Sequence, residues 1–218
     1  ADGRAVRFAD GMDRPSETSK VFESLRFYTN FANEESDVYS WNDSMENSFE
    51  AFVRGKSAFY FGFAFEYPRI RARAPQMVFE VVPVPQLNPD SKNAVNVANY
   101  WVESVVKKSK NQNEAWDFIR FITLPENVLV YTEVANQPSP LRSHVAKQKE
   151  NVSLAPFVEY ILTAKNWYKG RNVNGAVSAF DDMIRAYKEP YIEGAKVGPI
   201  ERDANIIIRA AKVIQQTM

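Results

Sequence analysis

Seven aromatic and polar side chains in the sequence have the chemistry to bind a small polyhydroxyl molecule. They are Trp41, Asn42, Phe63, Glu66, Tyr67, Trp101 and Trp167. Aromatic rings stack on the apolar C–H faces of a sugar, while carboxylates and amides form hydrogen bonds with its hydroxyl groups. Residues of these types bind a solute without breaking a bond in it, so the sequence predicts a binding site and not a catalytic one.

Each of these residues also has a structural interpretation. Trp41 lies in a polar loop beside Asn42, where a ligand-facing ring and a packed ring are equally consistent with the sequence. Glu66 is also consistent with a solvated carboxylate in the first turn of a helix, and Trp101 with core packing. Trp167 lies in an irregular stretch between helices, where it either faces a ligand or packs at a hinge.

Catalytic and metal-binding sites have little support. The absence of cysteine excludes disulfides, thiol catalysis and cysteine-based metal sites. The single histidine, His144, lies in a polar stretch and is predicted to be a plain surface residue. Asp181 and Asp182 are neighbours on a predicted helix and diverge by about 100°, so they are predicted to line a helix face and not to act as an acid–base pair. No glycine pattern for cradling a nucleotide occurs, and we expect no cofactor.

Composition narrows the possible partners. The 218 residues include 27 Lys and Arg and 27 Asp and Glu, so the formal charge is zero. Proteins that bind nucleic acid through its phosphates usually carry a basic excess, so we expect no nucleic-acid partner. No apolar run reaches the roughly 18–20 residues of a membrane span, and no signal peptide opens the sequence. For an exported protein, the sequence therefore predicts that the export signal was removed or never included.

Hydrophobic periodicity predicts short helices and a few buried strands. Helices are expected over residues 18–32, 44–55, 68–74, 112–122, 124–135, 155–165, 175–187 and 200–216. Strands are expected over 57–61 and 78–82, with further extended structure over 95–106 and a polar linker over 86–96. Asn111 and Glu114 form a predicted capping box, and Trp116 is predicted to face the core. This mixture indicates an α/β or α+β fold.

Five segments occur in a particular order. The first segment consists of residues 25–32 followed by Tyr-Ser-Trp-Asn at 39–42. The second is the pattern F-x-x-F-x-x-G-K-x-A-F-x-x-G over 49–62. The third segment is Val-Val-Pro-Val-Pro at 81–85. The fourth is residues 105–122, which include the run E-A-W-D-F-I-R-F-I. The fifth is a predicted helix that begins with Pro-Glu at 125, followed by the Pro-Ser-Pro-Leu-Arg loop at 138–142. Together they resemble the family-1 extracellular solute-binding proteins of ABC importers, the maltose-binding-protein-like class. Phe59 stands where the family pattern has Met.

The resemblance implies an α/β fold of the periplasmic-binding-protein-like type II, with two lobes around a cleft. It covers about residues 20–190 and matches only the second half of the family's length, so the fold is expected to be partial. Residues 1–85 and 150–218 would form the C-terminal lobe. Residues 86–149 would form the late-returning segment of the N-terminal lobe, and the polar linker over 86–96 fits that crossing.

The resemblance also implies a function. The chain is expected to be an extracytoplasmic receptor, tethered in the full-length protein, that delivers a solute such as a sugar to the permease of an ABC importer. The family places ligand contacts after the strand that ends at Gly62 and runs its last crossing near Trp167. The surface left uncovered by a missing half is a possible dimer interface.

Two alternatives from other classes stay open at this stage. A carbohydrate-active hydrolase would need two carboxylates about 5–10 Å apart across a pocket, and Glu66 and Asp43 are its candidates. A non-catalytic helical interaction module would expose a large apolar patch and have no concave aromatic site.

Overall fold

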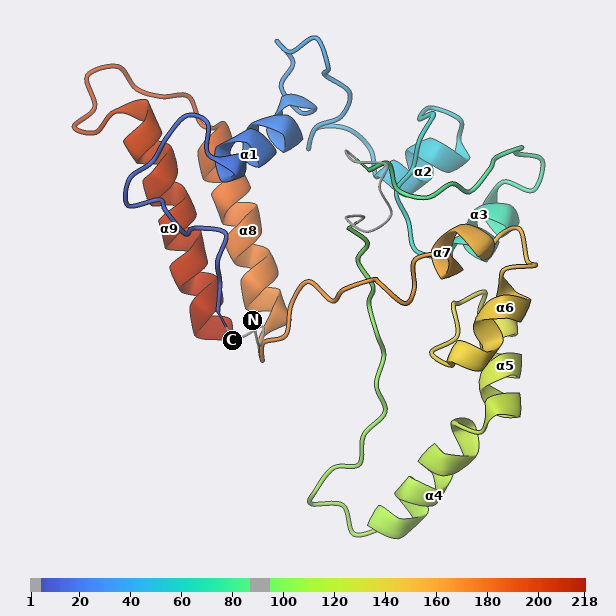
Figure 1. Cartoon of the computed structure of the whole chain (residues 1–218). Helices are drawn as coiled ribbons and strands as arrows, with labels where there is room; N and C mark the ends of the chain where they lie inside the picture. Colours follow the sequence, from blue (N-terminus) through green and yellow to red (C-terminus); the bar gives the residue numbers. More distant parts are fainter. Residues whose placement is uncertain (1–4, 87–94) are drawn as a thin grey trace. The chain divides into compact units, whose positions relative to one another are not determined.

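The computed structural model describes residues 5–86 and 95–218, and the chain divides into two compact units (Figure 1). The terminal unit comprises residues 1–45 and 168–218, and the central unit comprises residues 46–167. These bounds differ from the predicted lobe bounds, which fall at 85/86 and 149/150. In the observed units and in the predicted lobes alike, the N-terminal and C-terminal parts of the chain belong to one unit and a middle segment forms the other. The assignment of either part to a lobe of the family fold stays a prediction.

The terminal unit is built on three helices, α1 (Lys20–Asn30), α8 (Val173–Lys188) and α9 (Pro199–Thr217). Helices α8 and α9 lie side by side along most of their length (Figure 1). The helices predicted over 175–187 and 200–216 are thereby confirmed. The three helices share a core that comprises Met12, Phe22, Leu25, Met183, Ala204, Ile207 and Ala210. Small alanines alternate with larger side chains in this core, which lets the helices approach closely.

Local signals set the ends of these helices. The Asn172 side chain accepts a hydrogen bond from the Gly175 N–H and caps α8. Pro199 stands in the first turn of α9, where its missing N–H is not needed. At the C-terminal end of α8, the Arg202 guanidinium donates to the carbonyls of Ala186 (2.7 Å) and Glu189 (2.6 Å). Helices α8 and α9 are therefore fixed to each other by hydrogen bonds as well as by packing.

The central unit consists of short helices joined by long extended segments. The helices are α2 (Ser48–Val53), α3 (Glu66–Arg73), α4 (Gln112–Ile122), α5 (Pro125–Val134), the 3-10 turn η2 (Arg142–His144), α6 (Val145–Gln148) and α7 (Ala155–Val158). A small core of Ala64, Leu154 and Val158 joins the start of α3 to α7. Helix α7 is much shorter than the helix predicted over 155–165.

The predicted strands at 57–61 and 78–82 are not formed. Across residues 5–86 and 95–218, the only β-type pairing is an isolated parallel bridge between Val97 and Lys165. Neither predicted strand has a neighbouring strand for its backbone groups in the described residues, and a ladder needs two partners. The family fold implies an α/β sheet, and the part of the chain described here is helical and extended instead.

Several predicted helix details also change. Helix α2 begins at Ser48 and not near Ser44, because Asn47 supplies the side chain that caps it. Asn111 does precede α4, but its side chain makes no capping hydrogen bond. Trp116 is 47% exposed, and α4 has no buried residue, so the predicted core role of Trp116 is wrong.

Candidate functional site

Three of the seven predicted site residues, Phe63, Glu66 and Tyr67, lie together at the start of α3. The Tyr60 hydroxyl donates to Glu66 Oε1 at 2.7 Å, and the Phe63 N–H donates to Glu66 Oε2 at 3.0 Å. The Glu66 N–H in turn donates to the Phe63 carbonyl at 2.9 Å. This reciprocal bonding fixes the Glu66 carboxylate beside the Phe63 backbone and begins the helix.

Gly62 leaves the space that this arrangement needs. A Cβ at position 62 would stand 2.7 Å from Glu66 Oε2 and 2.7 Å from the Tyr60 ring. The contact is closer than real Cβ atoms approach, so a larger residue would displace the Tyr60–Glu66 pair. The sequence prediction used Gly62 to mark the end of a strand and as the last residue of the family pattern over 49–62.

Burial, the hydrogen bond to Glu66 and the negative charge of Glu66 together raise the pKa of Tyr60 to about 12. The Tyr60 hydroxyl therefore stays protonated and serves as a donor across the neutral pH range. Arg69 lies 3.6 Å from Glu66 Oε1 and opposes part of this shift. Each Glu66 oxygen has two lone pairs, so after these contacts the carboxylate retains capacity to accept hydrogen bonds from a ligand.

Two aromatic pairs are formed by residues near Glu66 in the sequence and in its cluster. Phe63 and Phe65 stack with an interplanar angle of 11° and a centroid separation of 5.9 Å, and both are partly exposed. Tyr67 packs against Phe79 at 5.3 Å. Tyr67 is thus held in an internal cluster, while the Phe63–Phe65 pair presents ring surface to solvent.

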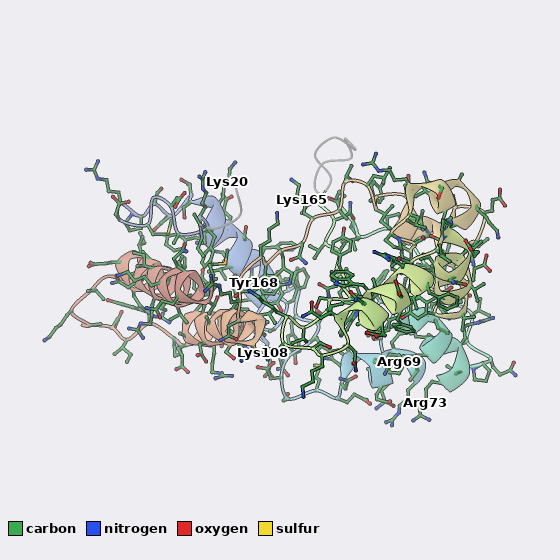
Figure 2. All side chains as sticks on the ribbon, turned by 90° about the horizontal axis from the view of Figure 1, so that it is seen from below. Lys20, Arg69, Arg73, Lys108, Lys165 and Tyr168 are labelled. Atoms are coloured by element: carbon green, nitrogen blue, oxygen red, sulfur yellow. The ribbon has the colours of Figure 1, made fainter. Side chains whose placement is uncertain are left out.

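Helix α3 carries a row of arginines that contact the same cluster, and Figure 2 labels Arg69 and Arg73 on it. The Arg69 guanidinium lies 4.9 Å from the Phe49 ring centroid, and that of Arg71 lies 5.8 Å from the Phe79 centroid. The sequence prediction treated these arginines as a solvated helix face. Their heads are exposed, but each has an aromatic or acidic partner.

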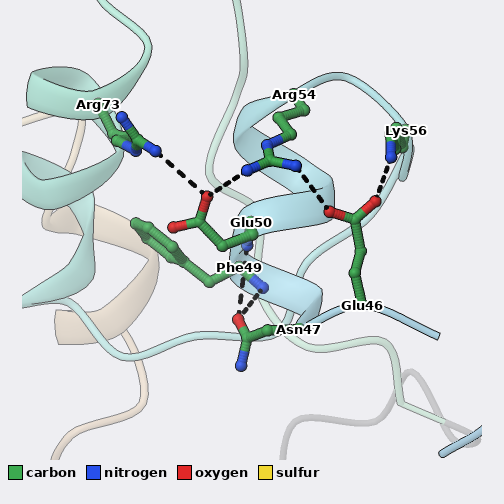
Figure 3. Close-up of polar contacts among 7 residues, drawn as sticks. All are labelled: Glu46, Asn47, Phe49, Glu50, Arg54, Lys56 and Arg73. Carbon is green, nitrogen blue, oxygen red and sulfur yellow. Dashed lines mark hydrogen bonds and ion pairs between the residues drawn. The ribbon is translucent and has the colours of Figure 1, made fainter. Parts of the chain in front are cut away.

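Helix α2 is tied to α3 by an ion-pair network (Figure 3). Glu50 pairs with Arg54 at 3.5 Å and with Arg73 at 3.4 Å, while Glu46 pairs with Arg54 at 3.3 Å and with Lys56. The Lys56 ammonium that donates to Glu46 lowers the pKa of that carboxyl. These exposed pairs orient the two helices more than they stabilise them.

A second support holds the loop before Glu66. Asn136 adopts φ 49°, and its side-chain N–H donates to the Ala64 carbonyl at 3.0 Å, while the Ser153 hydroxyl donates to Asn136 Oδ1 at 3.1 Å. A left-handed backbone is tolerated by Asn better than by most residues. Asn136 therefore links the end of α5 to the segment that carries Phe63 and Glu66.

Gln148 organises the Pro-Ser-Pro loop from inside the central unit. Its buried side chain accepts from the Ser139 N–H at 2.7 Å and donates to the Gln137 carbonyl at 3.1 Å. The Ser139 hydroxyl lies 2.9 Å from His144 Nδ1. His144 was predicted to be a plain surface residue and is instead half-buried and hydrogen-bonded.

Trp101 and Trp167 come from the two segments that the parallel bridge joins. The Lys165 N–H donates to the Asn96 carbonyl at 2.9 Å, and the Ala98 N–H donates to the Lys165 carbonyl at 3.1 Å. Trp101 is 92% exposed, and Trp167 is about half-exposed. Core packing, the alternative for Trp101, is therefore not what the structure shows.

Trp41 and Asn42 belong to the terminal unit. The Trp41 N–H donates to the Phe31 carbonyl at 3.0 Å, which folds the 32–41 loop back on the end of α1. The Asn42 amide donates to Glu34 and to the Tyr39 hydroxyl, and its oxygen accepts from Ser44. Asn42 thus has a structural task in the loop, and its role toward a ligand stays a prediction.

The sequence prediction missed Tyr60, Phe65 and Arg69. Tyr60 was assigned to a buried strand, and the signal that it pairs with Glu66 is the glycine between them at position 62. Asp43, the carboxylate considered with Glu66 for hydrolysis, is fully exposed and lies 3.7 Å from Lys188.

Within residues 5–86 and 95–218, no group of three or more His, Asp or Glu side chains is arranged to hold a metal ion. The same residues include no helix with the length and apolar character needed to cross a bilayer.

Comparison with known proteins completes the description of the site. The comparison with curated proteins and the comparison with solved structures gave no match. A family model described as "Bacterial extracellular solute-binding protein" matches residues 2–156, which include α2, α3 and the Tyr60–Glu66 pair. The match covers well over half of the chain and confirms the resemblance found in the sequence. The chain belongs to the bacterial extracellular solute-binding proteins.

Proposed function

We propose that this chain is a receptor for a carbohydrate, which it passes to the permease of an ABC importer. Membership of the family establishes extracellular solute binding and an extracytoplasmic location at the family level. The choice of a sugar, delivery to a permease, and tethering of the receptor to the cell surface are parts of the proposal.

The observation that carries the choice of a sugar is the exposed Phe63–Phe65 pair beside the Glu66 carboxylate. The two stacked rings are nearly parallel and partly exposed, so they offer apolar ring surface, and the Glu66 carboxylate accepts hydrogen bonds from the Tyr60 hydroxyl and the Phe63 N–H. A pyranose ring has the same two features, an apolar C–H face and a rim of hydroxyl donors. The other predicted contacts, Trp41, Trp101 and Trp167, supply further aromatic surface in the proposal.

Calorimetric titration of the chain with a panel of mono- and oligosaccharides tests the proposal. We expect saturable binding of one sugar and a rise in melting temperature, because a ligand that binds only the folded state stabilises it. Phe63→Ala should weaken binding about tenfold, which corresponds to about 1.4 kcal/mol. Phe118→Ala is the matched control, since Phe118 is an exposed phenylalanine on α4 outside the proposed site.

Glu66→Gln separates a receptor from a hydrolase. The substitution keeps the shape of the side chain and removes its charge, so the loss of a charge-assisted hydrogen bond should weaken sugar binding by about 10- to 100-fold. Chromogenic glycosides should not be turned over by the wild-type chain. Turnover that Glu66→Gln abolishes would overturn the receptor proposal and favour the hydrolase. A panel in which no sugar binds and no sugar raises the melting temperature contradicts the choice of a carbohydrate.

A further inference from the structure

A row of basic side chains begins at the candidate site and runs along α3. Arg69 lies 3.6 Å from Glu66 Oε1, and Arg73 follows it four residues later. Side chains four residues apart lie on the same face of a helix, and Figure 2 labels both arginines on α3. The row therefore extends from the Glu66 carboxylate of the candidate site toward the C-terminal end of α3.

Helix α2 continues this basic row, as Figure 3 shows. Arg73 and Arg54 both contact Glu50 Oε2, at 3.4 Å and 3.5 Å. Arg54 also contacts Glu46 Oε2 at 3.3 Å, and Lys56 donates to the other oxygen of Glu46. Two guanidinium groups that converge on one carboxylate oxygen leave an excess of positive charge around it.

The cations of the row face solvent more than its carboxylates do. The side chains of Arg54, Lys56, Arg69 and Arg73 are 55–59% exposed, whereas those of the three glutamates are 13–36% exposed. A ligand that approaches from solvent therefore meets a surface on which positive charge predominates. The formal charge of the whole chain is zero, so this attraction is a property of the row and not of the whole protein.

The guanidinium groups of the row also have unused donors. Among the described residues, the hydrogen bonds of Arg54, Arg69 and Arg73 side chains are one from Arg54 to Glu46 and one from Arg73 to Glu50. A guanidinium carries several N–H donors, arranged so that a planar carboxylate can accept two parallel bonds. Exposed ion pairs contribute little to stability, so a second carboxylate can join the network at small cost.

The spacing of the row matches a chain of sugars. Positions 66, 69 and 73 follow one another at about 4.5 Å and about 6 Å along α3, at 1.5 Å per residue. These spacings are close to the length of one pyranose unit. Successive units of an oligosaccharide that lies along α3 would therefore reach the Glu66 carboxylate, then Arg69, then Arg73.

We propose that the solute is an acidic oligosaccharide, whose uronic acid units carry carboxylates. This ligand class rests on the proposed function as a carbohydrate receptor. One sugar stacks on the Phe63–Phe65 pair and donates its hydroxyls to Glu66, and the carboxylates of the next units pair with Arg69 and Arg73. The Glu66 charge is already offset by Arg69 and by the Tyr60 hydroxyl, so it opposes such a ligand only weakly.

Calorimetric titration with two matched ligands tests the requirement for charge. The first ligand is a short oligogalacturonate, and the second is the same oligomer with its carboxyl groups methyl-esterified, which keeps the rings and removes the charge. At low salt we expect the free acid to bind about tenfold more tightly than the ester, because charge-assisted hydrogen bonds are stronger than neutral ones. The difference should shrink above about 0.15 M salt, where screening acts within about 8 Å.

Substitutions in the row locate the ligand carboxylates. Arg73→Gln should weaken binding of the free acid about five- to tenfold and leave binding of the ester unchanged. Arg120→Gln is the matched control, because Arg120 is an exposed arginine on α4 that also pairs with one carboxylate, that of Asp117. It should bind both ligands as the wild type does. Circular dichroism checks that both variants keep their helices.

The outcomes separate the ligand class from the receptor proposal. If the ester or a neutral sugar binds and the free acid binds no more tightly, the carbohydrate receptor stands and the acidic ligand is overturned. If Arg73→Gln keeps the full preference for the free acid, the carboxylates bind elsewhere and the assignment to the row is overturned. If neither the acid, the ester nor any neutral sugar binds, the choice of a carbohydrate fails and the acidic ligand fails with it.

Discussion

The terminal and central units differ in how their apolar residues are used. In the terminal unit α1, α8 and α9 share one core, and Ile207 at its centre is fully buried. Among the described residues of the central unit, the core cluster around Leu154 has three buried members, and α4 buries none of its residues. Val78, in the predicted strand over 78–82, is 97% exposed.

The reason lies in the backbone. A helix satisfies its own N–H and C=O groups and needs only another apolar face beside it, which α8 and α9 provide for each other. An extended segment satisfies its backbone only through a neighbouring strand. The central unit is rich in such segments, so many of its apolar side chains are exposed to solvent. The terminal unit buries its apolar side chains between its helices.

The largest expected effect is in the core of the terminal unit. Ile207→Ala removes a fully buried side chain and should lower the free energy of unfolding of that unit by about 2–5 kcal/mol. Differential scanning calorimetry should show the transition of the terminal unit shifted downward. Ile192→Ala, at an exposed isoleucine, is the control and should change stability by less than about 0.5 kcal/mol. Equal shifts in the two variants would contradict the core assignment.

Substitutions of Asn136 test whether its hydrogen bonds stabilise the candidate site in the central unit, which has only a small core. Asn136→Ala removes the hydrogen bonds to Ala64 and Ser153, and alanine tolerates the left-handed conformation of this position less well than asparagine does. The free energy of unfolding should fall by about 2–3 kcal/mol. Asn136→Gly loses the same hydrogen bonds but relieves the backbone, so denaturant titration should show a smaller loss. A larger loss in the glycine variant argues against backbone strain as a contribution.

Tyr60 makes the stability of the central unit depend on pH in the alkaline range. Its folded pKa of about 12 lies above the unfolded value near 10, so the folded state holds the proton more tightly. The stability from the neutral hydroxyl is present below pH 10 and is lost as the pH rises from about 10 to about 12. Urea titrations across this range should show wild type losing stability relative to Tyr60→Phe. Glu66→Gln should narrow the window, because it removes the charge while burial remains.

The smallest expected effect is at an exposed position of the central unit. Val78→Thr should change the free energy of unfolding by less than about 0.5 kcal/mol, because Val78 packs against almost nothing in the monomer. Val158→Thr, the matched substitution in the small core of the same unit, buries a hydroxyl and should lower it by about 1–3 kcal/mol. A large effect at Val78 would show that the 78–82 segment is covered in solution.

The same contrast explains which parts of the fold were predictable. The helices predicted over 175–187 and 200–216 are confirmed as α8 and α9, since their apolar period depends on the sequence of each helix alone. The predicted strands at 57–61 and 78–82 are wrong. Their sequences have β-propensity, but pairing depends on residues elsewhere that no local pattern specifies.

The candidate site was predictable in part for a similar reason. Phe63, Glu66 and Tyr67 were selected together because the family resemblance places ligand contacts after the predicted strand that ends at Gly62, and the structure places them in one turn. The Tyr60 partner was missed, because a buried strand was predicted over residues 57–61 and gave no sign of the role of the Tyr60 hydroxyl. The support from Asn136 spans 72 residues and has no local signal.

The terminal unit is assembled from residues that are far apart in the chain, and this has a consequence for synthesis. The Val6 N–H donates to the Gln215 side chain across 209 residues. On a ribosome that adds about 5–20 residues per second, α1 waits on the order of ten seconds after its own synthesis before α8 and α9 emerge. During that interval Phe22 and Leu25 have no core to join. A chaperone that shields the α1 segment should therefore act early, before the central unit is complete.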